Sequence, residues 1–277
     1  MRRGVISLVL LAGAVLLAVF GSGGDGRPDR QVEVAAPRST PTTTALSARP
    51  SPAGDGPATT TATTLRLPPA FPSTTTIPPH RSLVATVTGA SVEVFDSPEA
   101  GVAASRSFGN PRPSGAEQVF LVIGERGDWL NVMLPVRPNG STGWIRGRDV
   151  TLAGHDYRIT VELGAHKLTV FKGDGIFHEE AVGVGVENTP TPGGRFYTVE
   201  LFASQKPAYG PFAYGLSGYS EVLYDFAGGD GQFGIHGTSE PSGLGSDVSN
   251  GCIRMSNDGI TRLAETLPIG VPVEIRA

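Results

Sequence analysis

Short runs of alternating apolar and polar residues, separated by turns rich in Gly and Pro, limit most strongly what this chain can fold into. In the second half of the chain these runs cover residues 157–162, 166–171, 177–186, 195–202, 232–236 and 271–275. Alternation with a period of two turns one face of a strand toward a core. The 277 residues include 38 Gly and 23 Pro, which disfavours long helices. We therefore predict a mainly β domain over residues 155–277, with its last strand at a sheet edge because Pro272 lacks an N–H.

One clear helix is predicted near the C-terminus. Ser256 or Asn257 can cap its start, and Pro268 with Gly270 ends it. Its apolar stripe has helical spacing and consists of Ile260, Leu263, Ala264 and Leu267.

A second β domain is predicted over residues 82–153. Alternating runs at 83–87, 91–95, 119–123, 129–134 and 143–145, with turn residues between them, indicate a small antiparallel barrel. The pattern of Trp129 and Trp144 resembles the final strands of bacterial SH3-like domains. Tryptophans in a small barrel more often fill its core than line a ligand groove, so we interpret both mainly as packing residues.

The N-terminal part of the chain predicts export. Arg2 and Arg3 precede an apolar run that ends near residue 21, which indicates a signal peptide or, as we favour, a signal anchor that contacts the membrane. Residues 22–81 are rich in Pro, Thr and Ser and cannot bury a core, so they are predicted to be a disordered linker. A net charge of −4 argues against a nucleic-acid partner. The expected location is the cell envelope, outside the cytoplasm.

The most informative chemistry is one Cys and one His that share a Gly-rich stretch. Cys252 is the only cysteine of the chain, and His236 precedes it. The intervening glycines allow sharp turns that can bring imidazole and thiol together. A free thiol has a pKa near ~8.5 and needs a neighbouring base to act as a nucleophile at neutral pH. Each residue alone is more often structural, but together they favour covalent catalysis.

Around this pair the sequence resembles the L,D-transpeptidase catalytic domain family. The resemblance rests on His236-Gly237 followed by Ser249-Asn250-Gly251-Cys252-Ile253-Arg254, and extends over residues 157–275, including the runs 215–219 and 234–238. It implies that Cys252 is the nucleophile and His236 the base, with the Gly237 carbonyl orienting the imidazole. Backbone N–H groups of Asn250, Gly251 and Cys252 are then candidates for the oxyanion hole. Substrate-binding roles are implied for Ser249, Arg254 and Tyr219, with Asp247 as an alternative partner for Arg254.

One position departs from the family pattern. Asn250 stands where the family has a second histidine directly before Gly-Cys. An amide can form hydrogen bonds but cannot carry a proton at neutral pH, so this departure concerns positioning rather than the base.

The resemblance also implies a reaction. Such an enzyme cross-links peptidoglycan stem peptides through an acyl-enzyme, releases a terminal D-alanine, and is inhibited by carbapenem-type β-lactams. It needs no metal or organic cofactor, and the spacing of His155, His166 and His178 does not suggest a metal site. The alternatives are an L,D-carboxypeptidase, a sortase-like transpeptidase, whose His-to-Cys gap is far longer, and a non-catalytic cell-wall-binding protein in which Cys252 is idle.

Overall fold

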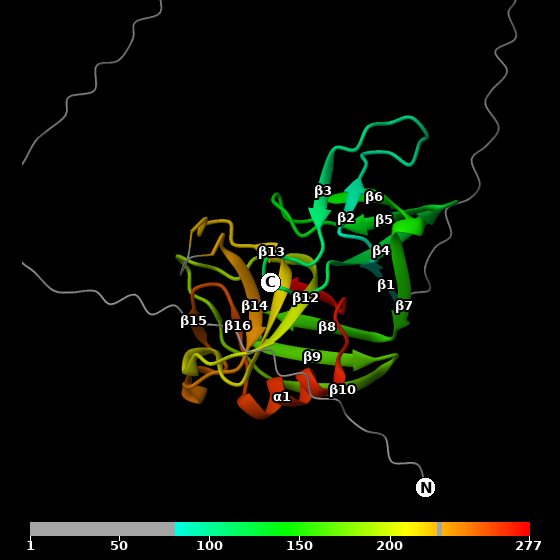
Figure 1. Ribbon diagram of the computed structural model, residues 1–277. Coiled ribbons are helices and arrows are strands. Elements are labelled where there is room, and N and C mark those ends of the chain that lie inside the picture. The colour runs from blue at the N-terminus through cyan, green and yellow to red at the C-terminus, as the bar shows by residue number, and fades with distance from the viewer. Residues whose placement is uncertain (1–80, 226–228) are drawn as a thin grey trace, which may run out of the picture. The chain divides into compact units, whose positions relative to one another are not determined.

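The computed structural model describes residues 81–225 and 229–277, which form two β modules (Figure 1). The predicted export segment 1–21, and the linker 22–81 apart from Arg81, lie outside the described residues. Within the described ranges no helix is long and apolar enough to cross a membrane.

The N-terminal module is a five-stranded antiparallel sheet with a separate two-stranded pair. Each of the five predicted runs overlaps a strand, and the runs 91–95 and 129–134 extend one residue beyond it. The sheet order is β6-β5-β4-β1-β7, and β2 pairs with β3. Its elements are β1 Ser82–Val87, β2 Ser91–Val94, β3 Arg106–Gly109, β4 Val119–Arg126, β5 Trp129–Met133, β6 Thr142–Arg146, the 3-10 turn η1 Gly147–Asp149, and β7 Val150–His155. The SH3-like assignment of this module stays a prediction.

The tryptophan of β5 has a packing role. The ring of Trp129 meets the ring of Phe95 edge-on, with centroids 5.0 Å apart, and the Arg146 guanidinium lies 4.4 Å from the centroid of its ring. Two neighbours therefore cover this indole, as expected for a residue of the rim of a small β module.

The C-terminal module is built on an eight-stranded curled sheet with the order β10-β9-β8-β17-β12-β13-β14-β16, and a short pair, β11 with β15, stands beside it. Its strands are β8 Tyr157–Glu162, β9 Lys167–Lys172, β10 Gly175–Ala181, β11 Val184–Gly185, β12 Gly194–Ala203, β13 Phe212–Tyr219, β14 Gln232–His236, β15 Asp247–Ser249, β16 Ile253–Arg254 and β17 Pro272–Arg276. The remaining elements are η2 Pro207–Tyr209, η3 Pro241–Gly243 and α1 Asn257–Thr266.

The last strand is not at an edge, so that prediction is wrong. β17 lies between β8, to which it is parallel, and β12, to which it is antiparallel. Pro272 is tolerated there because it is the first residue of the strand, where the ladder begins.

Helix α1 begins where the sequence predicted. The hydroxyl of Ser256 accepts a hydrogen bond from the Gly259 N–H at 3.0 Å, which identifies Ser256 as the N-cap. Ile260 and Leu263 are buried in the core of the C-terminal module, and the Tyr214 hydroxyl donates to the Leu263 carbonyl at 3.0 Å. The helix is thereby fixed against β13.

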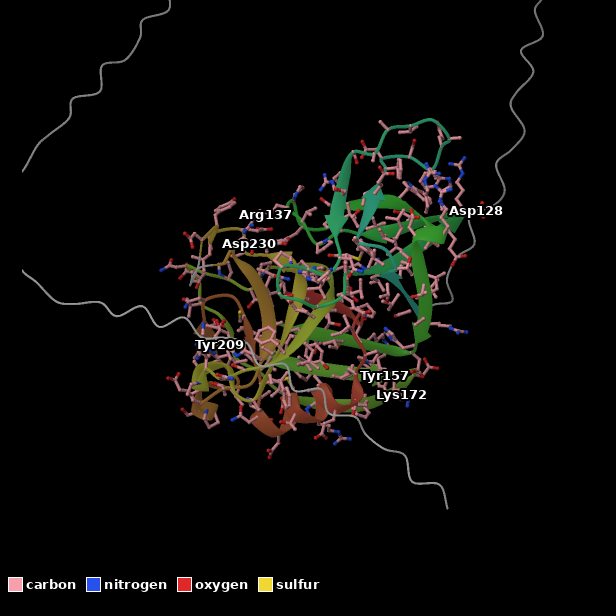
Figure 2. The ribbon with its side chains drawn as sticks, in the orientation of Figure 1. Asp128, Arg137, Tyr157, Lys172, Tyr209 and Asp230 are labelled. Carbon is pink, nitrogen blue, oxygen red and sulfur yellow. The ribbon has the colours of Figure 1, made fainter. Side chains whose placement is uncertain are left out.

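Besides the core of each module, an apolar cluster joins the two modules. It combines Val84, Val119, Leu121 and Met133 of the N-terminal sheet with Tyr197 and Val199 of β12. The fully buried Tyr197 hydroxyl lies 3.2 Å from the Val119 carbonyl and 3.3 Å from the Met133 carbonyl. Arg137 adds polar contacts, donating to the carbonyls of Ser220, Leu223 and Asp230 (Figure 2).

We expect Tyr197→Phe to lower the free energy of unfolding by about 1–3 kcal/mol, because it leaves buried carbonyls without their donor. Urea unfolding of the full chain measures this change. Tyr224→Phe is the control, since Tyr224 is 67% exposed, and it should change the free energy by less than about 0.5 kcal/mol. Equal effects of the two substitutions would contradict the role given to the Tyr197 hydroxyl.

Candidate active site

His236 and Cys252 line the same pocket, which has a volume of about 410 Å³. The pocket lies over β12, β13 and β14, and its other walls include Glu200, Phe202 and Tyr209. The sequence predicted that the Gly-rich stretch brings the imidazole and the thiol together, and the structure confirms that both line one pocket.

Strand register explains why these residues meet. β13 places Ala213 opposite His236 and Gly215 opposite Gly234, while β14 and β16 run parallel with His236 opposite Arg254. Cys252 lies two residues before Arg254 and interacts with the backbone of Gly234. Cys252 directly precedes β16, and this pairing brings the thiol and the imidazole to the same pocket.

The imidazole of His236 is buried and held by its own neighbour. Its Nδ1 lies 2.6 Å from the Gly237 carbonyl, which is the contact that the resemblance implied. Burial lowers the pKa of His236 to about 4, the hydrogen bond to Gly237 opposes this change, and the Arg254 charge adds to it. A neutral imidazole that donates from Nδ1 keeps Nε2 free to accept a proton.

The thiol of Cys252 also rests in its neutral form. Burial raises its pKa, while the Gly234 backbone and the Arg254 charge act in the opposite direction. Among the described residues no hydrogen bond joins this thiol to the His236 imidazole. Catalytic contacts often shorten only when substrate binds, so this geometry is compatible with the predicted roles of a base and its nucleophile.

The loop before Cys252 is braced by Ser249. The buried Ser249 hydroxyl donates to the Cys252 carbonyl at 2.6 Å and accepts from the Gly251 N–H at 3.0 Å. Gly251 has φ +110°, a conformation that side-chain-bearing residues rarely adopt. Two expectations are therefore corrected: Ser249 braces the loop instead of facing substrate, and the Gly251 N–H is occupied and cannot serve an oxyanion.

Arg254 is a cation near the reactive pair, and Lys206 lines the pocket itself. The Arg254 Nη1 lies 3.4 Å from a carboxylate oxygen of Glu240, and the Arg254 Nε is buried without a hydrogen-bond partner. The predicted alternative partner, Asp247, instead pairs with His166 at 2.8 Å. An acid does pair with Arg254, as that alternative expected, but the acid is Glu240 and not Asp247.

Two other expected site residues differ in their position. The Asn250 residue is exposed, consistent with a positioning role that does not involve burial. Tyr219 does not line the pocket, since its hydroxyl donates to the Pro135 carbonyl at 2.9 Å and its ring stacks under Arg137. It belongs to the junction between the modules, which corrects the prediction of a groove wall.

Sequence reasoning missed Tyr209. This residue, labelled in Figure 2, ends η2. Its ring meets the His236 imidazole edge-on, with centroids 4.5 Å apart. Burial and the neighbouring Cys252 raise the pKa of its hydroxyl. The only signal was local, a tyrosine between Pro207 and Gly210 in a short loop, and such loops are common.

Comparison with known proteins decides the family. The family model of the L,D-transpeptidase catalytic domain, YkuD, matches residues 156–275. The protein YkuD of Bacillus subtilis, which is named as an L,D-transpeptidase, is 33% identical over 150 residues, covering 52% of this chain and 84% of that protein. This chain belongs to the L,D-transpeptidase family. Its namesake in Bacillus licheniformis is 38% identical over 120 residues, covering 43% of this chain and 65% of that protein.

A solved structure of this L,D-transpeptidase family is also similar. L,D-transpeptidase 3 from Mycobacterium tuberculosis, in complex with a faropenem-derived adduct, is 15% identical, with a TM-score of 0.40. The match covers 57% of this chain and 74% of that one.

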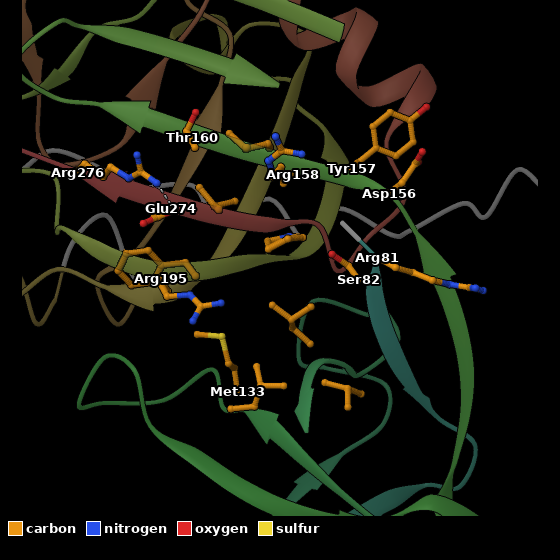
Figure 3. Close-up of a pocket in the computed structure, with 17 residues that line it drawn as sticks. Arg81, Ser82, Met133, Asp156, Tyr157, Arg158, Thr160, Arg195, Glu274 and Arg276 are labelled. Atoms are coloured by element: carbon orange, nitrogen blue, oxygen red, sulfur yellow. Dashed lines mark hydrogen bonds and ion pairs between the residues drawn. The ribbon is translucent and has the colours of Figure 1, made fainter. Parts of the chain in front are cut away.

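A second pocket of the chain, about 400 Å³, lies away from the pair (Figure 3). Arg81, Arg158, Arg195 and Arg276 stand around it, with Glu274 bound to Arg276 at 2.7 Å. It contains neither Cys252 nor His236, so it is not the reaction site. In the described ranges no three His, Cys, Asp or Glu side chains are grouped as a metal site would need.

The neutral pair predicts a particular pH dependence of thiol reactivity. Because burial raises the thiol pKa and lowers the His236 pKa to about 4, thiolate should be scarce at neutral pH. We expect the rate of Cys252 alkylation by iodoacetamide, followed by mass, to rise steadily from pH 6 to above ~9. The urea-unfolded chain, with an ordinary thiol pKa, is the control and should react at lower pH. A rate that stays constant from pH 5 to 8 would reveal a thiolate–imidazolium pair instead.

Proposed function

We propose that this chain is a cysteine-dependent L,D-transpeptidase that cross-links peptidoglycan stem peptides. The observation that supports it best is the joint placement of Cys252 and His236 in one pocket. The Gly237 carbonyl occupies Nδ1 of the imidazole, which leaves Nε2 as a base for the thiol. Membership of the L,D-transpeptidase family supplies the reaction class.

The first half of the proposed reaction forms a thioester. His236 Nε2 takes the thiol proton, and Cys252 Sγ attacks the carbonyl of the third residue of a stem tetrapeptide. The resulting oxyanion collapses, the bond to the terminal D-alanine breaks, and the imidazolium returns its proton to the departing amine. Since the resting pair is neutral, proton transfer and attack are coupled in this proposal.

The negatively charged oxygen of the tetrahedral intermediate needs hydrogen-bond donors to stabilise it. With the Gly251 N–H bound to Ser249, the backbone N–H groups of Asn250 and Cys252 remain the candidates. Arg254 adds a positive charge near the thiol and acts to lower the pKa of both Cys252 and His236, which favours the thiolate of the one and the neutral imidazole of the other. We assign Arg254 an electrostatic role, in addition to any contact with a substrate carboxylate.

The second half transfers the acyl group. The side-chain amine of another stem attacks the thioester, His236 accepts its proton, and the Cys252 thiolate leaves. Water in place of the amine would make the enzyme an L,D-carboxypeptidase. The proposal also places the protein outside the cytoplasmic membrane, where peptidoglycan lies. The apolar run and the Pro- and Thr-rich segment of residues 1–81 support such a tether.

Intact mass of the protein tests the nucleophile. We expect faropenem to add covalently to the wild-type chain and not to Cys252→Ala, because the β-lactam carbonyl offers the thiol an acyl group. Incubation with a stem tetrapeptide should release D-alanine and form peptide dimers. Release without dimers would favour the carboxypeptidase. If faropenem left the protein mass unchanged and the stem tetrapeptide released no D-alanine, an idle cysteine in a wall-binding protein would be favoured.

The roles of His236 and Asn250 can be ranked by the rate of faropenem acylation. His236→Ala should lower this rate by about 10²–10⁴, the loss expected for a positioned general base. Asn250→Ala removes one exposed amide and should cost about tenfold or less. Asn250→His, which restores the family pattern, is the matched control and should stay within that tenfold. If folded Asn250→Ala were as slow as His236→Ala, His236 would not be the single base.

A further inference from the structure

Glu200 is an acidic side chain of the pocket that the proposed reaction does not use. It comes from β12 and lines the same pocket as His236 and Cys252. Its side chain is only 12% exposed, and no hydrogen bond to either carboxylate oxygen occurs in the part of the chain that the structure describes. A sheltered carboxylate without hydrogen-bond donors is costly unless a partner or ligand satisfies it.

The pairing of strands puts Glu200 in line with the nucleophile. Glu200 lies opposite Gly215, and Gly215 lies opposite Gly234. Gly234 in turn contacts Cys252. Two glycines therefore form the floor between the carboxylate and the thiol.

Gly215 makes the room that this carboxylate occupies. A Cβ at residue 215 would lie 2.8 Å from Oε1 and 2.9 Å from Cγ of Glu200, closer than real atoms approach. The carboxylate thus leans over β13 toward the pocket. Cys252 directly precedes β16, which lies two strands from β13 in the sheet. Two strand spacings amount to about 10 Å.

Arg112 fixes the carboxylate from behind. This residue belongs to a loop of the N-terminal module, and its Nε lies 3.9 Å from Glu200 Oε2 with side-chain exposure of 11%. That separation is too long for a hydrogen bond, and the Arg112 Nε has no other partner. The guanidinium stabilises the charge of Glu200 while leaving its oxygens able to accept from a ligand.

We propose that Glu200 binds the side-chain ammonium of the acyl-donor stem, an inference that rests on the proposed function. The amine that serves as acceptor on one stem is present on every stem, including the donor. When the donor carbonyl is bonded to Cys252, that amine extends across the glycine floor. A four-carbon stem reaches about 6 Å. A hydrogen bond of about 3 Å completes the distance to the carboxylate.

A purely structural role for the ion pair predicts something different. If Glu200 served only to fasten the N-terminal module to β12, removing its charge would affect all substrates alike. A binding role instead makes the effect depend on the charge of the substrate amine. The two explanations separate when the same variants are given donors with and without that charge.

The experiment uses two synthetic stem tetrapeptides, one with a free side-chain amine on its third residue and one with that amine acetylated. Single-turnover release of D-alanine is measured with full-length wild type, Glu200→Gln and Glu162→Gln. The control residue Glu162 is in another ion pair, 3.3 Å from Lys167. Wild type and Glu162→Gln should favour the free amine by about tenfold or more in kcat/KM, and Glu200→Gln should lose this preference.

Two outcomes would overturn the inference. One is a preference for the free amine that Glu200→Gln retains in full, and the other is a wild type that processes both peptides equally. Faropenem acylation of wild type and Glu162→Gln keeps the proposed function separate, because this penem has no amine. Acylation without amine preference overturns only the role of Glu200. Absence of both acylation and D-alanine release overturns the proposed function and this inference together.

Discussion

Backbone register across β12, β13 and β14 is the constraint on which the pocket depends. A slip of one residue would turn His236 to the opposite face of the sheet, since side chains alternate along a strand. The register changes at irregular positions between Thr198 and Glu200 and between Gly215 and Tyr219. These irregularities set which residues of neighbouring strands face each other, and therefore which side chains of β12 and β14 line the pocket.

The sequence predicted those parts of the fold that depend on local pattern. The runs 157–162 and 232–236 coincide with β8 and β14, because apolar residues occupy every second position in both. The cap at Ser256 and the contact of His236 with the next carbonyl are equally local, so the sequence or a family motif can indicate them. The sequence could indicate the proposed reacting pair, His236 and Cys252, because both residues lie in one short, distinctive stretch.

Long-range pairing was beyond the sequence. β13 was not predicted as a strand, since Gly215 and Gly218 interrupt its apolar pattern. The edge position of β17 was wrong because strand order is set by the packing of the whole sheet. Ser249 and Arg254 were assigned by their nearness to Cys252, and Tyr219 by its place in the family-like run 215–219. Their partners are a neighbouring carbonyl, Glu240 on another turn, and the N-terminal module, and no spacing rule specifies such contacts.

The N-terminal module contributes to the electrostatics of a pocket that it does not otherwise line. Its Arg112 is a cation beside Glu200, although the proposed nucleophile and base belong entirely to the C-terminal module. A catalytic sheet recombined with another N-terminal partner would keep its reactive pair but hold Glu200 without a counter-ion. Shuffling of modules in evolution or engineering is therefore a change of active-site charge as well as of architecture.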